Sequence, residues 1–227
     1  MSDLKPLFER LNIRPKDISI YEMALTHSSC NNDGHSSTRD YERLEFIGDS
    51  IIGFVSADLI YKLHPEMDQG LMSKLRSYLV CSKALANYSR SIGLIDYIKV
   101  GHSISKDQLN KSDKILEDVF ESFMGAIYLD LGYDVTRKVI KNFLYEPIKK
   151  TGIDEIIDPK TRLQEEIQAE YRDAVKYIVL DESGPAHDRS FEVAVLFNDI
   201  TLGKGQGKSK KQAEEEAARD ALSKRSV

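Results

Sequence analysis

Residues 42–50 read Glu-Arg-Leu-Glu-Phe-Ile-Gly-Asp-Ser, and this stretch predicts an amphipathic helix with an unusual polar face. On a helix, Glu42, Glu45 and Asp49 fall at about 0°, 300° and 340° around the axis, so the three carboxylates share one narrow face. Leu44, Ile47 and Ile51 fall on the opposite face, as expected of a helix packed inside a domain. Neighbouring carboxylates repel one another unless a cation lies between them. The stretch therefore predicts a packed helix with a cation-binding face.

A second acidic pair, Asp118 and Glu121, lies at i, i+3 further along the chain, opposite a strongly apolar helix face. The small residues Gly48, Gly125 and Ala126 would let the two helices approach closely. If the two acidic faces meet, four or five carboxylates converge in one cleft. Oxygen ligands without His or Cys select Mg²⁺ or Mn²⁺ over zinc or copper. Each cluster taken alone is also compatible with an ordinary solvated helix face.

Helical spacing of apolar residues continues on both sides of these stretches and predicts an all-α domain over residues 1–150. One interruption is residues 28–40, whose polar and turn-forming side chains indicate a loop. Helical patterning resumes at Tyr41, and a further helix is expected over residues 71–90.

The pattern changes after a short linker, which we place at residues 151–158. A helix with Leu163, Ile167 and Tyr171 on one face is followed by alternating apolar residues that predict three strands. The expected strands lie at 175–179, 191–197 and 200–202, with a tight turn at Asn198-Asp199. The last helix is expected to bury Ala213, Ala217, Ala221 and Leu222. The order α-β-β-β-α over residues 159–227 predicts a small α+β domain.

Composition and charge limit the classes of function. The chain has 227 residues and a net charge of −5, whereas proteins that hold phosphate usually carry a basic surplus. Cys30 and Cys81 are too few for a disulfide framework. Neither a signal peptide nor a membrane-spanning stretch is visible, so we expect a location in a reducing cytoplasm and no membrane partner.

Positive charge is segregated in the C-terminal part of the chain. Residues 158–227 carry 12 Lys and Arg against 14 Asp and Glu, a net charge of −2, yet residues 203–213 hold four lysines and no acid. Lys208, Lys210 and Lys211 at the start of the last helix would meet phosphates with side-chain charge and with exposed backbone N–H groups. A lysine cluster by itself is more often a solvated face.

The stretch at 42–50 resembles the signature motif of the ribonuclease III family. The resemblance extends to residues 24–28 (ALTHS), 72–77 (MSKLRS) and 116–130 (LEDVFESFMGAIYLD). Residues 203–214 resemble the end of a double-stranded RNA-binding domain. The resemblance thus covers nearly the whole chain in the order expected of the family.

The resemblance implies an endoribonuclease that cleaves double-stranded RNA with Mg²⁺, or with Mn²⁺ as a substitute, and leaves 5′-phosphate and 3′-hydroxyl ends. It implies that Glu45, Asp118 and Glu121 bind the metal and that Asp49 and Glu121 act in the hydrolytic step. Glu42 would be a supporting member of the acidic cluster.

The resemblance also implies further partners. Gln164 and Glu165 on the first helix of the C-terminal domain, and His187 in the following loop, would reach 2′-hydroxyls and base edges of the duplex. The nuclease domain would form a homodimer with two cleavage sites. Ribosomal RNA precursors and structured messenger RNAs would be the substrates, and no organic cofactor is expected.

One position departs from the family pattern, and two other functions stay open. Gln69 stands where the family commonly has Glu, so a member of the wider acidic cluster is here an uncharged amide. A duplex-RNA-binding regulator that does not cleave is one alternative, although the four metal and catalytic carboxylates are intact. A helical di-metal redox protein would normally need Glu-x-x-His pairs, which the sequence lacks.

Overall fold

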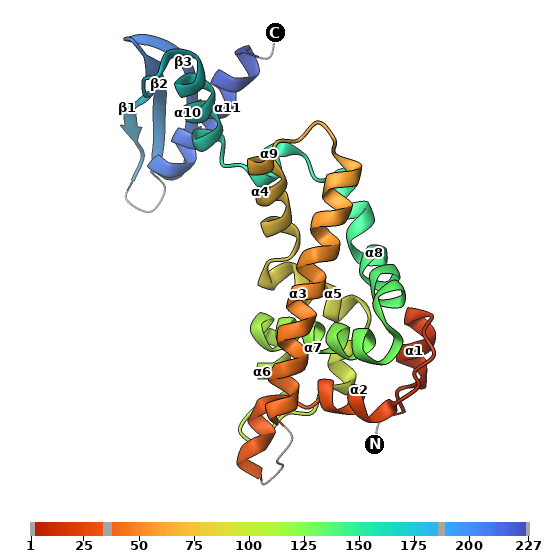
Figure 1. Cartoon of the computed structure of the whole chain (residues 1–227). Helices are drawn as coiled ribbons and strands as arrows, with labels where there is room; N and C mark the ends of the chain where they lie inside the picture. Colours follow the sequence, from red (N-terminus) through yellow and green to blue (C-terminus); the bar gives the residue numbers. More distant parts are fainter. Residues whose placement is uncertain (1–2, 34–37, 186–188, 226–227) are drawn as a thin grey trace. The chain divides into compact units, whose positions relative to one another are not determined.

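The structure is a computed structural model, and it describes residues 3–33, 38–185 and 189–225 (Figure 1). The chain divides into two compact units, Met1–Thr151 and Gly152–Val227. Each unit has its own buried core. Among the described helices, none combines the length and the apolarity that crossing a bilayer would require.

The first unit is helical, which confirms the all-α prediction for this part of the chain. Its helices are α1 (Lys5–Leu11), α2 (Ile18–Ala24), η1 (Ser28–Asp33, a 3₁₀ helix), α3 (Thr38–Leu63), α4 (Gln69–Leu79), α5 (Ser82–Ser91), η2 (Leu94–Tyr97, a 3₁₀ helix), α6 (Lys106–Lys111), α7 (Asp113–Leu131) and α8 (Tyr133–Lys150).

Two expected boundaries differ from those in the structure. Part of the expected loop at 28–40 forms the 3₁₀ helix η1, and α3 already begins at Thr38. The single helix expected over 71–90 is two helices, α4 and α5. Cys81 adopts an extended conformation (φ −71°, ψ 161°) and is the N-cap residue of α5, so the helical hydrogen bonding is interrupted there.

Helix α7 lies at the centre of the first unit, where α2, α3, α5 and α8 all pack against it. Phe120, Phe123 and Ile127 are fully or almost fully buried, as their spacing predicts. On α3, Leu44 and Val55 are buried too. Ionisable groups are costly to bury without a partner, and the acidic residues of α7 lie where a hollow reaches the helix.

Two glycines set the distance between α3 and α7, which cross each other in Figure 1. A Cβ atom at Gly48 on α3 would overlap with the carbonyl oxygen of Glu121 on α7. In return, a Cβ atom at Gly125 on α7 would overlap with the carbonyl oxygen of Leu44 on α3. The two acid-bearing helices are therefore in backbone contact, and the expectation of a close approach at these glycines is confirmed.

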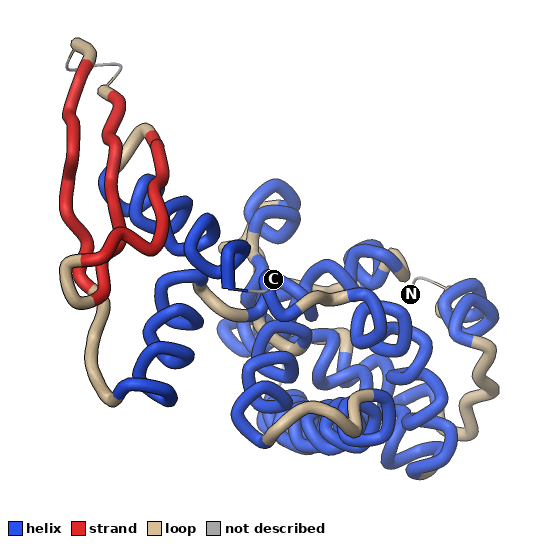
Figure 2. The backbone as a smooth tube through the Cα atoms, turned by 90° about the horizontal axis from the view of Figure 1, so that it is seen from above, coloured by secondary structure: helices blue, strands red, loops and turns tan. Residues whose placement is uncertain are grey.

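After a short helix, α9 (Ile153–Ile156), that lies within the expected linker at 151–158, the second unit has the predicted α-β-β-β-α order. Its further elements are α10 (Pro159–Tyr171), β1 (Lys176–Ser183), β2 (Ser190–Phe197), β3 (Ile200–Gly207) and α11 (Lys210–Arg225). The strands form one antiparallel sheet in the order β1-β2-β3. Figure 2 shows the three strands side by side with helices along one face. Leu163 and Ile167 of α10 are buried in this core, whereas Tyr171 is 57% exposed.

Strand β3 is longer than the predicted strand at 200–202. Gly203, Gly205 and Gly207 alternate along it, and a Cβ atom at any of them would overlap with atoms of α11. The alanines expected to be buried on α11 (Ala213, Ala217 and Ala221) are buried. Glycine is unfavourable in strands, so this segment has the composition of a loop, but close packing on α11 requires glycine here.

The turn between β2 and β3 is the tight two-residue turn that the sequence predicts. Asn198 and Asp199 both have positive φ, 48° and 60°. This is the backbone twist of a type I′ hairpin turn, which Asn and Asp tolerate better than other residues with a Cβ atom.

Candidate functional site

The acidic residues of α3 and α7 meet in one hollow of about 620 Å³, which we call the carboxylate hollow. Its lining residues are Ser28, Tyr41, Glu42, Glu45, Phe46, Asp49, Lys114, Glu117, Asp118 and Glu121. The structure thus brings all five of the carboxylates singled out by spacing to one place. Two of them come from α7, and three come from α3.

Three carboxylates form the inner part of the hollow. Glu45, Asp118 and Glu121 each offer an oxygen, and these oxygens lie within 4.8 Å of one another. Asp118 and Glu121 are 9% and 7% exposed, whereas Glu42 and Asp49 lie exposed at the rim. Opposite ligands of an octahedral Mg²⁺ are about 4.2 Å apart, so the three inner oxygens need only small shifts to share one ion.

Burial changes the protonation of the inner carboxylates. It raises the pKa of Glu121 to about 8, with further contributions from the negative charges of Asp49 and Glu117. Burial also raises the pKa of Asp118 and of Glu45. A site without a divalent ion therefore favours a proton on Glu121 at neutral pH.

Two buried oxygens at the hollow lack a hydrogen bond among the described residues. They are Oδ1 of Asp118 and the hydroxyl of Tyr41, whose side chain is only 2% exposed. Lys114 Nζ lies 2.6 Å from Asp118 Oδ1 and forms an ion pair with it, so of these two oxygens it is the Tyr41 hydroxyl that has neither a hydrogen bond nor an ion pair. Buried polar atoms without partners are rare in proteins and are expected where an ion or a water binds. The all-oxygen donor set of Glu45, Asp118 and Glu121 fits a hard divalent cation.

Tyr41, Lys114 and Glu117 are among the lining residues that did not emerge from the sequence as candidates. Each lies four residues before a carboxylate of the inner part, so each shares a helix face with it. Tyr41 precedes Glu45, Lys114 precedes Asp118, and Glu117 precedes Glu121. Extending the helical spacing backwards by one turn would have found all three.

Gln69, the departure from the family pattern, is exposed at the first position of α4 and does not line the carboxylate hollow. The neighbouring Asp68 caps this helix, since its carboxylate accepts a 2.8 Å hydrogen bond from the Leu71 N–H.

The lysines expected to contact RNA surround the start of α11 in the second unit. Lys208 lies just after β3, and Lys210 and Lys211 are the first two residues of α11; all three are exposed. Lys210 Nζ lies 3.8 Å from Glu182, and Lys211 Nζ lies 3.8 Å from Glu215. Exposed ion pairs of this length are weak, so phosphate can compete for both lysines.

The other residues expected to contact RNA, Gln164, Glu165 and His187, differ in their surroundings. The Gln164 side chain accepts a 3.2 Å hydrogen bond from Val175 N–H and donates one of 3.4 Å to Asp173 O, which ties α10 to the start of β1. Glu165 is exposed on α10. His187 lies outside the described residues.

Comparison with known proteins gives the class of the chain. The Ribonuclease-III-like family matches residues 17–148, and the Double-stranded RNA binding motif matches residues 159–225. Together with the carboxylate hollow, these two matches define the class as nucleases that carry a double-stranded RNA-binding domain.

Individual relatives narrow the class to one family. The chain is 42% identical to Ribonuclease 3 of Onion yellows phytoplasma over 224 residues, which is 99% of this chain and 92% of the relative. It is 41% identical to Ribonuclease 3 of Lactococcus lactis subsp. lactis over 207 residues, which is 91% of this chain and 90% of the relative. The chain therefore belongs to the ribonuclease III family, whose members use a divalent metal.

A solved structure resembles the first unit. It is the nuclease domain of ribonuclease III from Campylobacter jejuni, studied for structural flexibility in a region involved in dimer formation. The TM-score is 0.58 at 27% sequence identity, and the match covers 64% of this chain and 98% of that chain.

Proposed function

We propose that this chain is an endoribonuclease that hydrolyses phosphodiester bonds of double-stranded RNA with Mg²⁺ held by Glu45, Asp118 and Glu121. The observation that carries the proposal is the convergence of these three oxygen ligands in one hollow, on a chain whose second unit matches a double-stranded RNA-binding motif. Mn²⁺ is the expected substitute, because it accepts the same ligands.

The chemistry follows from where the carboxylates lie. When bound, the ion supplies a water of lowered pKa and neutralises charge that develops on the phosphate. We assign to Asp49, which is exposed at the rim and whose charge acts on Glu121, the role of accepting the proton of the attacking water. Water attacks phosphorus, the P–O3′ bond breaks, and the leaving 3′ oxygen takes a proton. The products carry a 5′-phosphate and a 3′-hydroxyl.

The second unit would hold the duplex. Lysines at the start of α11 attract phosphates, and the exposed backbone N–H groups of the helix N-terminus add to that attraction. Recognition of this kind reads the A-form shape rather than the sequence, so ribosomal RNA precursors and structured messenger RNAs are both suitable substrates. Cys30 and Cys81 are thiols and do not form a disulfide with each other, which fits a cytoplasmic location.

A cleavage assay tests the function. A long perfectly paired RNA would be incubated with the chain in Mg²⁺, in Mn²⁺ and in chelator, and the products separated on a gel. We expect short duplexes with either metal, none with chelator, and a loss of at least about a hundredfold in rate with Asp49→Asn. The pair Lys208→Ala/Lys211→Ala should lower the affinity and reduce the slope of log K against log[salt] by about 2. Tight binding without cleavage in either metal would instead identify a duplex-RNA-binding regulator.

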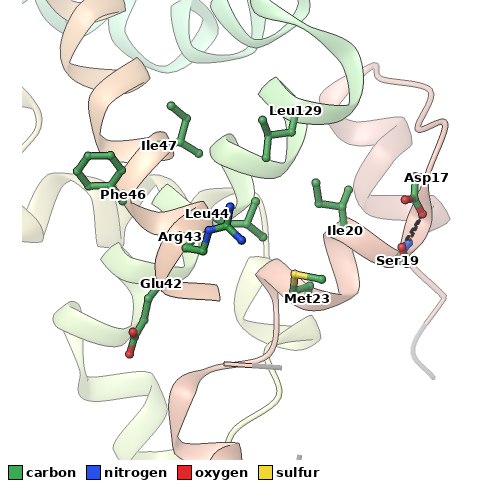
Figure 3. Close-up of a pocket in the computed structure, with 10 residues that line it drawn as sticks. All are labelled: Asp17, Ser19, Ile20, Met23, Glu42, Arg43, Leu44, Phe46, Ile47 and Leu129. Atoms are coloured by element: carbon green, nitrogen blue, oxygen red, sulfur yellow. Dashed lines mark hydrogen bonds between the residues drawn. The ribbon is translucent and has the colours of Figure 1, made fainter. Parts of the chain in front are cut away.

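We also propose that the first unit forms a homodimer through a second hollow of about 880 Å³ (Figure 3). Apolar side chains of α2, α3 and α7 line much of it, including Ile20, Met23, Ile47 and Leu129. Phe46 at its edge is 75% exposed, and Leu129 is 58% exposed. A twofold interface needs a protruding side chain and a recess on the same surface, and this surface offers both. In the Campylobacter jejuni relative, a region of the nuclease domain is involved in dimer formation.

Sedimentation of the full chain tests the dimer. Phe46→Ala should shift the protein from dimer to monomer at micromolar concentration, because truncating an aromatic residue that inserts into a partner's recess commonly costs about 2 kcal/mol or more of binding free energy. Tyr61→Ala is the matched control, since Tyr61 lies on the same helix, is 71% exposed and does not line the hollow. A wild-type chain that sediments as a monomer would contradict the proposal.

A further inference from the structure

The carboxylate hollow contains a cation of its own. Among its described lining residues, Lys114 is the single basic side chain, whereas six residues are acidic. The acidic residues are Glu42, Glu45, Asp49, Glu117, Asp118 and Glu121. The proposed function assigns metal binding to three of these acids and leaves Lys114 and Glu117 without a role.

The ammonium of Lys114 lies directly against one of the proposed metal ligands. Its Nζ atom is 2.6 Å from Asp118 Oδ1 and 3.6 Å from Glu117 Oε2. The lysine side chain is 69% exposed, whereas the Asp118 and Glu117 side chains are 12% and 16% exposed. The flexible lysine therefore reaches from the solvent to two carboxylates that are held in place by burial.

An ammonium in this position competes with a divalent ion for Asp118 Oδ1. A Mg²⁺ ligand oxygen lies about 2.1 Å from the ion, so an ion on Asp118 would come within a few ångströms of Nζ. Two cations at that distance repel each other strongly in a partly buried site. One of the two cations must therefore move away. The ammonium can do so, because the exposed side chain of Lys114 can rotate outward.

Glu117 is the carboxylate that can receive the displaced ammonium. It is already 3.6 Å from Nζ, and it is not one of the three residues whose oxygens converge within 4.8 Å. Moving the ammonium from Asp118 to Glu117 keeps it paired while it frees the ligand.

We propose that Lys114 is a resident counter-cation of the carboxylate hollow: it neutralises Asp118 while no divalent ion is bound and must move to Glu117 when one binds. This inference rests on the proposed function. Its consequence is that binding of the ion is an exchange of cations, so the affinity of the site for a divalent ion is lower than its six carboxylates alone would give.

Binding of Mn²⁺ to the full chain in the absence of RNA tests the exchange, because the electron paramagnetic resonance signal of free Mn²⁺ reports binding without any cleavage. We expect Lys114→Met to bind Mn²⁺ on the order of tenfold more tightly, a coupling typical of residues in contact. Lys111→Met is the matched control, since it removes the same charge from an exposed lysine that does not line the hollow. It should leave the affinity within about twofold, because an exposed charge outside the hollow is screened.

Glu117→Gln separates an exchange from simple attraction. If Glu117 receives the ammonium, Glu117→Gln weakens Mn²⁺ binding clearly in the wild-type background and much less in the Lys114→Met background. If Glu117 only attracts the ion, the loss is equal in both backgrounds. Equal losses, or Mn²⁺ binding by Lys114→Met that is unchanged or weaker, would overturn the inference.

A last pair of variants distinguishes failure of this inference from failure of the proposed function. Glu45→Gln and Asp118→Asn should abolish Mn²⁺ binding at the hollow. If both variants bind Mn²⁺ like the wild-type chain, the metal site itself is misassigned. If they lose binding but Lys114→Met is not tighter, only the role of Lys114 is wrong.

Discussion

Glu121 is a buried carboxylate whose pKa is raised by burial and by neighbouring negative charges, and it is one of the proposed metal ligands. It is 7% exposed, and burial raises its pKa to about 8 from an ordinary value of 4.5. Asp49 is the charged neighbour that contributes most to the rise after burial. Because a metal ligand must be deprotonated, binding of the ion and loss of this proton are linked.

Proton release should therefore accompany metal binding. At pH 7 we expect Mg²⁺ to displace most of one proton from Glu121, and Asp49→Asn should reduce the number released because it removes one cause of the raised pKa. Calorimetric titration in buffers with different ionisation enthalpies measures this number. Heats that do not depend on the buffer in the wild-type chain would contradict the assignment of Glu121 as a ligand with a raised pKa.

The stability of the metal-free chain should depend on pH in a definite direction. The pKa of Glu121 is higher in the folded state than in the unfolded state, so its contribution to stability is fully present below pH 4.5 and is lost as the pH rises through about 8. We expect the melting temperature in chelator to fall across this window and saturating Mg²⁺ to remove most of the fall. The melting temperature of Asp49→Asn in chelator should fall less across the same pH range, because this variant removes one cause of the raised pKa of Glu121.

Gln69 should have little influence on the chemical step, since it is exposed and lies outside the carboxylate hollow. We expect the wild-type chain to cleave far faster than Asp49→Asn, and Gln69→Glu to change the rate by less than about tenfold, the effect of a charge that does not touch the reacting atoms. Single-turnover cleavage measures both. Wild-type turnover as low as that of Asp49→Asn would show that the amide has disabled the site.

At this scale, the sequence predicts the residues that helical spacing alone brings together. Glu42, Glu45 and Asp49 share a face because 3.6 residues make a turn, and Asp118 and Glu121 do so for the same reason. The meeting of the two faces depends on how α3 packs on α7, which spacing does not contain. The position of Lys114 depends on that packing too, because a lysine before an acidic residue is usually an ordinary helix-surface pair.

The crossing of α3 and α7 is the element-scale feature on which the hollow depends. Gly48→Ala would push its Cβ atom into the Glu121 carbonyl, and we expect a loss of about 2 kcal/mol or more in the free energy of unfolding, together with weaker Mn²⁺ binding. Gly53→Ala is the matched control on the same helix, because its Cβ atom meets nothing within 4 Å. It should stabilise the chain by about 0.5–1 kcal/mol, as expected for alanine in place of glycine in a helix. Chemical denaturation checks both, and equal effects would contradict the packing argument.

Element boundaries were predicted less well than element types, for identifiable reasons. The end of α4 at Leu79 is not marked by Gly or Pro, so the break before Cys81 is set by packing rather than by local sequence. Residues 203–207 continue β3 although their glycines are poor strand formers. These glycines are required because the strand packs closely on the alanines of α11. The alternating pattern used to predict a strand does not include α11, so it could not reveal this packing.

At the scale of the whole molecule, a net charge of −5 is reconciled with binding of a polyanion by segregation. Acidic residues concentrate at the carboxylate hollow of the first unit, where cations are needed, and lysines gather at the start of α11 in the second unit. The change of period from helical to alternating predicted the two architectures from the sequence. The homodimer was predicted only from the family resemblance, because no periodic pattern in the sequence marks the surface around Phe46.

The two compact units are one polypeptide that divides between Thr151 and Gly152, and this has a kinetic consequence. Once the second unit has bound a duplex, the first unit is held near the same RNA. For a short connection, the effective concentration of the first unit near that RNA is in the millimolar range. At nanomolar protein, the intact chain should cleave about 10²- to 10⁴-fold faster than an equimolar mixture of the separated units. The difference in cleavage rate between the intact chain and the separated units should become smaller as the RNA concentration rises. Linking the two units therefore increases the rate most at low RNA concentration.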